Sequence, residues 1–159
     1  MPQQSKTQTP WQHLLNEKLE KEMLHRTIPL TSYYLLRQHV LPDVFGRSNH
    51  AIMYWSGKSI GNQLQVTDIQ SCIDCFGSLQ LGTLTVKRES SKEIQFTLQN
   101  APLLQFVTLN LTPPFDPSFE CGLISGMVEN ALKTAVSGHY EITNKNTSWP
   151  IAEITITTN

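Results

Sequence analysis

Phe119-Glu-Cys-Gly-Leu-Ile-Ser-Gly-Met-Val-Glu-Asn-Ala-Leu132 is the stretch that decides the fold, because its apolar periodicity predicts an amphipathic helix. An extended hydrophobic segment that ends near Leu111 precedes it, and a β-rich segment, residues 139–158, follows it. Two glycines, Gly122 and Gly126, lie one turn apart within the helix. We therefore expect a helix that packs tightly across an antiparallel sheet.

The ends of this helix are predicted from its capping residues. Asp116-Pro117 has the pattern of a helix start, and Gly138 is a plausible C-terminal stop. We expect Glu129, Asn130, Lys133, Thr134 and Ser137 to form the polar face of the helix.

The strands are predicted from a hydrophobic period of two. Residues 83–87 and 93–99 alternate apolar and polar side chains, and the polar link at residues 89–92 joins them as a hairpin. Two further strands are expected at residues 140–143 and 150–157. Alternation implies one solvated and one covered sheet face. The predicted fold class is α+β, a four-stranded antiparallel sheet packed on one side by helices.

Four helices are expected before the first strand. The first starts at Thr9-Pro10, and the second extends from Thr31 or Ser32 toward Val40 and is ended by Pro42 and Gly46. The third covers residues 48–64, where Met53, Ile60 and Leu64 share a face. The fourth is capped by Thr67. The fourth carries an apolar stripe of Ile69, Cys72, Ile73, Phe76 and Leu79. Because a mid-helix glycine costs about 1 kcal/mol relative to alanine, Gly57 and Gly61 in the third helix predict a close approach of another backbone.

Length, charge and cysteine content limit the class of protein. The 159 residues suit one domain, which we place at residues 9–159 after a disordered tail at residues 1–8. A net charge of -1 argues against nucleic-acid binding. No apolar run suits a membrane span or a signal peptide, and three cysteines fit a reducing compartment, so we expect a cytoplasmic protein without integral membrane association.

Several blocks of the sequence resemble known families. Residues 96–107 and 121–128 and the closing strand pair resemble the small subunits of the TRAPP vesicle-tethering complex and the bacterial 4-vinyl reductase domains. A closer resemblance, over about residues 31–157, is to the uncharacterised bacterial YslB-like family. Its marks are Leu41-Pro-Asp43, Tyr54-Trp-Ser-Gly-Lys58, Gly82-Thr-Leu-Thr85 and Glu120-Cys-Gly122.

The resemblance implies a TRAPP small-subunit-like fold that dimerises through its helices and encloses an apolar pocket. In the tethering subunits this pocket holds an acyl chain on a cysteine in the loop after the third helix. That loop here, residues 63–68, has no cysteine, which argues against covalent acylation by that route. Residues 139–159 also lack the cysteine typical of 4-vinyl reductase domains, which weakens a metal or photopigment interpretation.

Five residues are candidates for ligand binding. If the third helix faces a pocket, Tyr54 and Trp55 would line an apolar cavity and Lys58 would give it a cationic mouth, suited to an anionic amphiphile. The alternative places both rings in the core and Lys58 in solvent or beside an acid. Glu120 either complements the helix dipole or faces the pocket. Cys121 is interpreted as packing rather than as a nucleophile, because no sequence feature supplies an activating base.

Other candidate sites have weaker support. Cys72-Ile-Asp-Cys75 has redox-pair spacing but lies mid-helix, and no second ligand pair accompanies it, so structural packing is favoured. Gly57-Lys58-Ser59 lacks the preceding glycine of a phosphate-binding loop. Surface or capping roles are expected for the histidines, His13, His25, His39, His50 and His139.

The sequence thus predicts a non-enzymatic domain, without a cofactor or metal, that binds a small hydrophobic or amphipathic molecule or lipid as a homodimer. Two alternatives stay open. One is a homodimeric protein-interaction scaffold whose cavity has closed, and the other is a Cys-x-x-Cys oxidoreductase.

Overall fold

A computed structural model describes residues 14, 29–104, 107, 115–144 and 150–159 of the chain. The predicted N-terminal tail and the helix that starts at Thr9-Pro10 lie outside the described residues, apart from Leu14. Most of the predicted extended segment that ends near Leu111 lies outside them as well.

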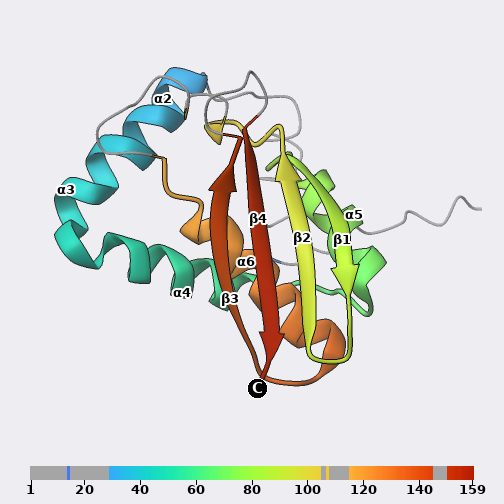
Figure 1. The fold of residues 1–159 in the computed structure, drawn as a ribbon. Helices are drawn as coiled ribbons and strands as arrows, with labels where there is room; N and C mark the ends of the chain where they lie inside the picture. Colours follow the sequence, from blue (N-terminus) through green and yellow to red (C-terminus); the bar gives the residue numbers. More distant parts are fainter. Residues whose placement is uncertain (1–13, 15–28, 105–106, 108–114, 145–149) are drawn as a thin grey trace, which may run out of the picture.

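A four-stranded antiparallel sheet forms one layer of the domain, as predicted. Its strands are β1 (Thr83–Glu89), β2 (Glu93–Gln99), β3 (Val136–Thr143) and β4 (Ile151–Thr158). They lie in the order β1-β2-β4-β3, so the C-terminal strand β4 lies between β2 and β3. Figure 1 shows the sheet with the helices behind it and its other face open.

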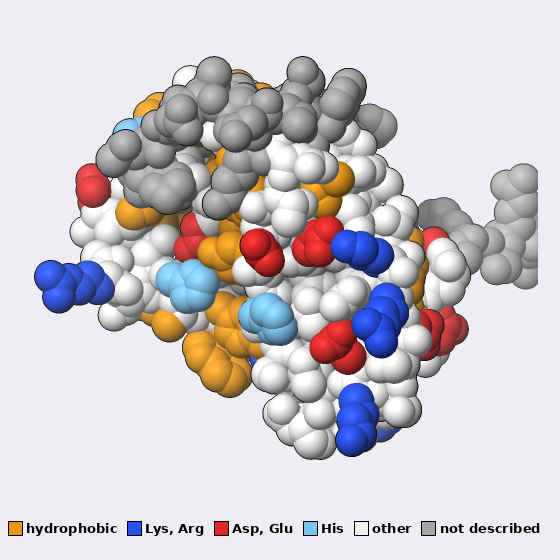
Figure 2. Space-filling model, viewed as in Figure 1, with side chains coloured by type: hydrophobic (Ala, Val, Ile, Leu, Met, Phe, Trp, Pro, Cys, Tyr) orange, Lys and Arg blue, Asp and Glu red, His pale blue; other side chains and the backbone are white. Residues whose placement is uncertain are grey.

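The covered face of the sheet contributes alternating side chains to the core. Ile94 and Phe96 on β2 lie opposite Ile156 and Ile154 on β4, and all four are buried. On the edge strand β1, Leu84 is buried, whereas Val86, the last regularly paired residue before a β-bulge, is 37% exposed. In the same view the open face carries polar and charged side chains (Figure 2).

The helix α6 (Ser118–Leu132) crosses the covered face, but it is not amphipathic as predicted. Every residue from Glu120 to Val128 is buried. The reason is that the sheet covers one side of α6 while the helices α4 (Asn49–Gly61) and α5 (Ile69–Ser78) pack against other sides. A helix covered on several sides has no solvated face to carry polar residues.

The end of α6 also differs from the prediction. Lys133 adopts a left-handed conformation with φ of 54° directly after the helix, and β3 begins three residues later. Gly138 therefore lies within β3 and does not stop the helix. Glu129 and Asn130 are only partly buried, but they bond to the backbone of Val136 and Leu64 rather than facing solvent.

Two pairs of glycines set the contact between α4 and α6. A Cβ atom added at Gly57 or Gly61 would overlap the backbone of α6, and one added at Gly122 or Gly126 would overlap the backbone of α4. The close approach that was predicted from these glycines is therefore confirmed. Leu64, beyond the end of α4, is buried, whereas Ile60 is 37% exposed, so the predicted shared face is wrong.

The chain from Leu30 to Phe45 forms an irregular helical arm, made of α2 (Leu30–Leu35), the π-helix η2 (Leu36–Val40) and α3 (Leu41–Phe45). The prediction that Pro42 ends the helix is wrong. Pro42 lies in the first turn of α3, where its missing N–H is tolerated, and Gly46 with φ of 54° ends the arm. Figure 1 shows the arm standing beside the sheet.

Two helix caps differ from the predicted ones. Asp68, not Thr67, caps α5, where its carboxylate accepts from the Ser71 amide and the Ser71 hydroxyl accepts from the Asp68 amide in return. Pro117 is the capping residue of α6, while the Asp116 carboxylate accepts from the Ser118 amide at 2.8 Å. No helix in the described part of the chain has the length and apolar character to cross a membrane.

Candidate functional site

A pocket of about 360 Å³ lies between the arm, the start of α4, the start of α6 and strand β3. The arm contributes Arg37 and Gln38, which are its only residues with buried side chains among those described. Apolar, polar and charged groups all line it. Among the described residues, the lining consists of Arg37, Gln38, Pro42, Gly46, Arg47, Asn49, His50, Met53, Phe115, Asp116 and Tyr140.

One wall of the pocket is built on a buried ion pair between Arg37 of η2 and Glu120 of α6. The two guanidinium nitrogens lie 3.0 and 3.1 Å from the two carboxylate oxygens, which is a bidentate geometry. Arg37 also donates to the Tyr33 hydroxyl at 2.9 Å and to the Asp116 carbonyl at 3.3 Å. Burial alone would lower the pKa of Arg37, but the carboxylate of Glu120 raises it above its usual value, so the arginine stays charged.

Asp116 is the centre of a second polar group on the pocket wall. Its carboxylate accepts from the Ser118 amide, the Ser118 hydroxyl and the Tyr140 hydroxyl, and it lies 3.4 Å from His50 Nδ1. Burial would raise the pKa of Asp116, but these hydrogen bonds hold it below its usual value. Burial and the adjacent carboxylate both raise the pKa of Tyr140, so the phenol stays protonated.

Ser118, His50 and Asp116 contain the residue types of a hydrolytic triad without its geometry. Ser118 is fully buried, and its hydroxyl donates to Asp116 while its oxygen lies 2.6 Å from His50 Nδ1. The histidine must then donate from Nδ1, so it cannot accept the serine proton as a base would. Both Ser118 and Asp116 also contact the same ring nitrogen. The cluster therefore orders the pocket wall and does not activate a nucleophile.

None of the five residues singled out from the sequence is among those that line this pocket. Glu120 comes nearest, because it binds the pocket residue Arg37. Cys121 is buried in the core, and burial raises its pKa to about 12. Trp55 is 63% exposed on the outer side of α4, where Lys58 Nζ lies 5.5 Å from its ring centre. The ligand-binding role of these five residues stays a prediction.

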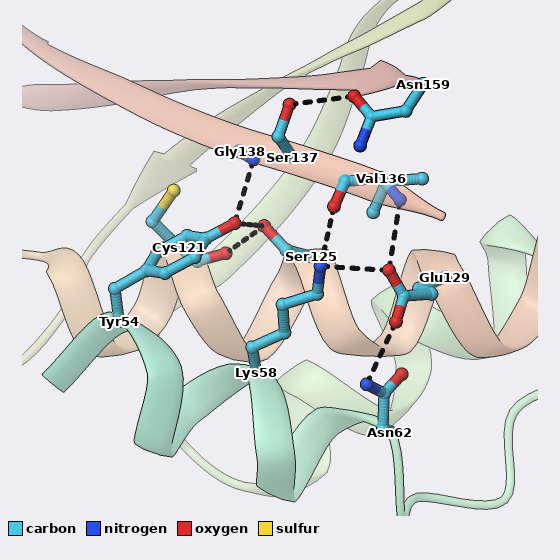
Figure 3. Close-up of polar contacts among 10 residues, drawn as sticks. All are labelled: Tyr54, Lys58, Asn62, Cys121, Ser125, Glu129, Val136, Ser137, Gly138 and Asn159. Atoms are coloured by element: carbon cyan, nitrogen blue, oxygen red, sulfur yellow. Dashed lines mark hydrogen bonds and ion pairs between the residues drawn. The ribbon is translucent and has the colours of Figure 1, made fainter. Parts of the chain in front are cut away.

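Lys58 and Tyr54 join α4 to strand β3 in a polar clamp (Figure 3). Lys58 Nζ donates to the Val136 carbonyl at 2.6 Å and lies 2.9 Å from the Glu129 carboxylate, which in turn accepts from the Val136 amide. The Tyr54 hydroxyl accepts from the Gly138 amide at 2.9 Å. These contacts engage the polar ends of both side chains, so Lys58 and Tyr54 have a structural role in joining α4 to β3.

The Cys72-x-x-Cys75 pair is buried in α5, and both thiols are free. Burial raises the pKa of Cys72 to about 12 and that of Cys75 to about 11. A reactive thiol needs the opposite shift. The packing interpretation is therefore the one that the geometry supports.

The pocket residues carried little signal in the sequence. Arg37, Asp116 and Tyr140 are far apart in the chain, and each is brought to the pocket by a different element. Arg37, directly after the apolar run Tyr33-Tyr-Leu-Leu36, was the strongest local hint, because a charge on an apolar helix requires a partner. His50 was expected to have a surface or capping role, and it is both exposed and bound to the Asp116 cluster.

Several solved structures have a fold similar to that of this chain. A vinyl-4-reductase family protein from Methanocaldococcus jannaschii matches with a TM-score of 0.58 and 16% identity, over 95% of this chain and 97% of that one. Trafficking protein particle complex subunit 3 from Naegleria fowleri, covalently bound to palmitic acid, matches with a TM-score of 0.55 and 16% identity, over 90% and 97%. The phenol-responsive sensory domain of the transcription activator PoxR, with phenol, matches with a TM-score of 0.64 and 6% identity, over 82% and 75%.

These likenesses confirm the predicted TRAPP-like α+β fold. At the sequence level, the uncharacterised protein YslB of Bacillus subtilis (strain 168) is 25% identical over 114 residues, which is 72% of this chain and 75% of that protein. The model of the family described as "Protein of unknown function (DUF2507)" matches residues 30–157. The chain therefore belongs to the DUF2507 family, and the YslB-like resemblance is confirmed.

Proposed function

We propose that this protein binds a small hydrophobic or amphipathic molecule in the pocket between the arm and α4, without catalysing a reaction on it. The observation that carries the proposal is the pocket itself, which has a volume of about 360 Å³ and combines apolar groups with convergent polar ones. Small-molecule sites in proteins have this character and volumes of about 300–1,000 Å³.

The structural neighbours support the same proposal. The PoxR sensory domain was solved with phenol, and the Naegleria fowleri subunit with palmitic acid. Their identity to this chain is 6% and 16%, so the likeness concerns the fold, and the ligand here must be argued from this chain's own pocket.

A binding role without chemistry agrees with the state of the nucleophile candidates. Ser118 is buried and donates to Asp116, and all three cysteines are buried and free. Free thiols are typical of a reducing compartment, which supports the proposal that the protein acts in the cytoplasm.

Differential scanning fluorimetry with a panel of neutral, anionic and cationic fragments tests this proposal. Met53→Trp would fill the pocket, so we expect it to abolish the rise in melting temperature that a bound fragment causes. The matched control is Thr85→Trp, at an exposed position on β1, which should keep the response. The proposal fails if no fragment raises the melting temperature, or if Met53→Trp binds as well as the wild type.

We propose homodimerisation through the arm as a second role. The arm exposes aliphatic side chains that a helix normally buries. They are Leu30 (39% exposed), Leu35 (50%), Leu36 (48%), Val40 (49%) and Val44 (68%). Exposed apolar side chains of this kind on a protein surface mark an interaction site. A twofold pairing of two arms would bury these side chains on both copies.

Sedimentation velocity at micromolar concentration tests the dimer. We expect the wild type to sediment as a dimer and Val40→Glu to sediment as a monomer, because a carboxylate at the centre of the paired arms would be desolvated. Val86→Glu is the control, since Val86 is 37% exposed on β1 away from the arm. A monomeric wild type would remove the dimer proposal and leave the pocket proposal intact.

A further inference from the structure

The charged groups of the pocket decide which class of ligand it accepts, and most of them are already paired. Both terminal nitrogens of Arg37 are engaged by Glu120, Tyr33 and the Asp116 carbonyl. The Asp116 carboxylate receives three hydrogen bonds from Ser118 and Tyr140 and lies beside His50. These two charges are satisfied by the protein, so neither demands a ligand of opposite charge.

Arg47 differs from them. It lies in the 3-10 turn Gly46–Ser48 between the arm and α4, it lines the pocket, and it is exposed. In the described part of the chain it makes no hydrogen bond or ion pair, and the lining holds no acid besides Asp116. The pocket thus carries one cation without a counter-charge. A guanidinium presents a planar fork of donors that matches a carboxylate.

Asn49 gives a second, independent observation. Its side-chain oxygen is buried without a hydrogen-bond partner, the only such side-chain atom found among the described residues. Buried polar atoms are nearly always paired in native proteins. Because Asn49 lines the pocket, a rotation of its side chain that turns this buried oxygen toward the cavity would let a ligand donor satisfy it.

The remaining lining limits the ligand's size and shape. Pro42, Met53 and Phe115 offer apolar contacts for a compact body. A pocket of about 360 Å³ lies near the lower end of the range for small-molecule sites, about 300–1,000 Å³, which favours a compact ligand. No cysteine lines it, so the pocket offers no thiol for a covalently attached acyl chain.

Resting on the proposed small-molecule function, we propose that the pocket's ligand is a compact organic carboxylate that also carries a hydrogen-bond donor. Its carboxylate pairs with Arg47, its apolar body lies against Met53 and Phe115, and its donor group pairs with the Asn49 amide. In this proposal Arg47 takes the cationic role, and Lys58, which bonds to Val136 and Glu129, does not line the pocket.

Isothermal titration calorimetry with aromatic probes tests the ligand class. The probes are benzoate, the three hydroxybenzoate isomers, phenol and benzylamine, so that the charge and the donor vary on one ring. We expect at least one hydroxybenzoate to bind most tightly and benzoate to bind more weakly. Phenol and benzylamine should bind at least about tenfold more weakly than that isomer, because they forfeit a charge-assisted hydrogen bond.

Variants locate the interaction. Arg47→Gln should weaken hydroxybenzoate binding about tenfold and leave phenol binding unchanged. Arg88→Gln, at an exposed arginine of β1 outside the lining, is the matched control and should bind like the wild type. Asn49→Leu should reduce the preference for the best hydroxybenzoate over benzoate, because it removes the amide that receives the donor.

The outcomes separate this inference from the proposed function. If no probe and no member of the wider fragment panel binds, both fail. If neutral or cationic probes bind as tightly as the carboxylates, or if Arg47→Gln binds hydroxybenzoate like the wild type, the carboxylate inference is wrong and the pocket proposal stands. Equal binding of benzoate and every hydroxybenzoate would contradict the proposal that the ligand carries a hydrogen-bond donor.

Discussion

At the residue scale, the glycines between α4 and α6 have the clearest physical role. Gly122 lies against the carbonyl oxygen of Tyr54, and Gly57 lies against that of Phe119, so each helix presents glycine to the backbone of the other. Such contacts leave no space for a Cβ atom. Close packing here is set by atoms that cannot move aside, because the neighbour is backbone rather than a flexible side chain.

Gly122→Ala should therefore lower the free energy of unfolding by about 1–3 kcal/mol or more, the usual cost of overpacking. Chemical denaturation measures the change. Gly77→Ala is the control, because a Cβ atom at Gly77 in α5 meets nothing within 4 Å, and alanine there should stabilise the helix by up to about 1 kcal/mol. Equal effects of the two substitutions would contradict the packing argument.

The clamp residue Glu129 connects stability to pH. Burial would raise its pKa, but Lys58, the Val136 amide and Asn62 together hold the pKa below its usual value. A carboxyl group whose pKa is lower in the folded state stabilises the fold above its unfolded pKa of about 4.3. This contribution is lost as the pH falls through the folded pKa.

We accordingly expect the free energy of unfolding to fall as the pH is lowered below about 4.3, and to fall less steeply in Glu129→Gln. Urea denaturation at a series of pH values measures both slopes. Glu153→Gln is the control, because Glu153 forms an exposed pair with Lys87, in which its side chain is 37% exposed. If the free energy of unfolding of Glu129→Gln falls with pH as steeply as that of the wild type, Glu129 in the clamp does not explain the loss of stability in acid.

At the scale of elements, the arm is attached to the rest of the domain in an unusual way. Its buried side chains are Arg37 and Gln38, while its large aliphatic residues are exposed. The Arg37–Glu120 pair therefore holds the arm together with Tyr33 and Tyr34, which are partly buried against the core. Arg37 and Gln38 both lie in the π-helix η2, and π-helical turns are frequent at functional sites.

Arg37→Met alone should cost about 3–5 kcal/mol, because it leaves the Glu120 carboxylate buried and unpaired. The double variant Arg37→Met with Glu120→Leu should recover most of this loss, since two apolar groups replace the pair. A double-mutant cycle by chemical denaturation measures the coupling. Hydrogen exchange over residues 30–45 should rise in the single variant and return toward the wild type in the double variant. Additive effects would show that the pair does not hold the arm.

At the scale of the whole molecule, one continuous core joins the covered face of the sheet to α5 and α6. The three cysteines lie within this core, with at most 1% exposure. Their protection is a property of the complete fold, because α5, α6 and the sheet each cover part of it.

The native protein should therefore fail to react with a thiol reagent such as DTNB at neutral pH. All three thiols should react once guanidinium unfolds the chain, because burial raises their pKa values to between about 11 and 12 in the folded state. The absorbance change counts the reacted thiols. Fast reaction of Cys72 or Cys75 in the native protein would revive the oxidoreductase alternative.

The elements that the sequence predicted well are those with local signals. Strand β2 was predicted with its observed bounds, because Ile94, Phe96 and Leu98 alternate with polar neighbours. The glycine contacts were predicted because a mid-helix glycine is costly unless a neighbour requires it. Helix α6 was predicted as a helix, but its nearly complete burial depends on which elements surround it.

By itself, the sequence determined the fold class, a close backbone approach at each of two glycine pairs and the membership of the DUF2507 family. Each of these depends on periodicity or on motifs within short stretches of the chain. Only the tertiary structure decided where the candidate pocket lies, that Lys58 belongs to a clamp, and that Arg47 has no partner among the described residues. The physical reason is that a charged side chain is identified by its partner, and the partners here come from elements up to 83 residues apart.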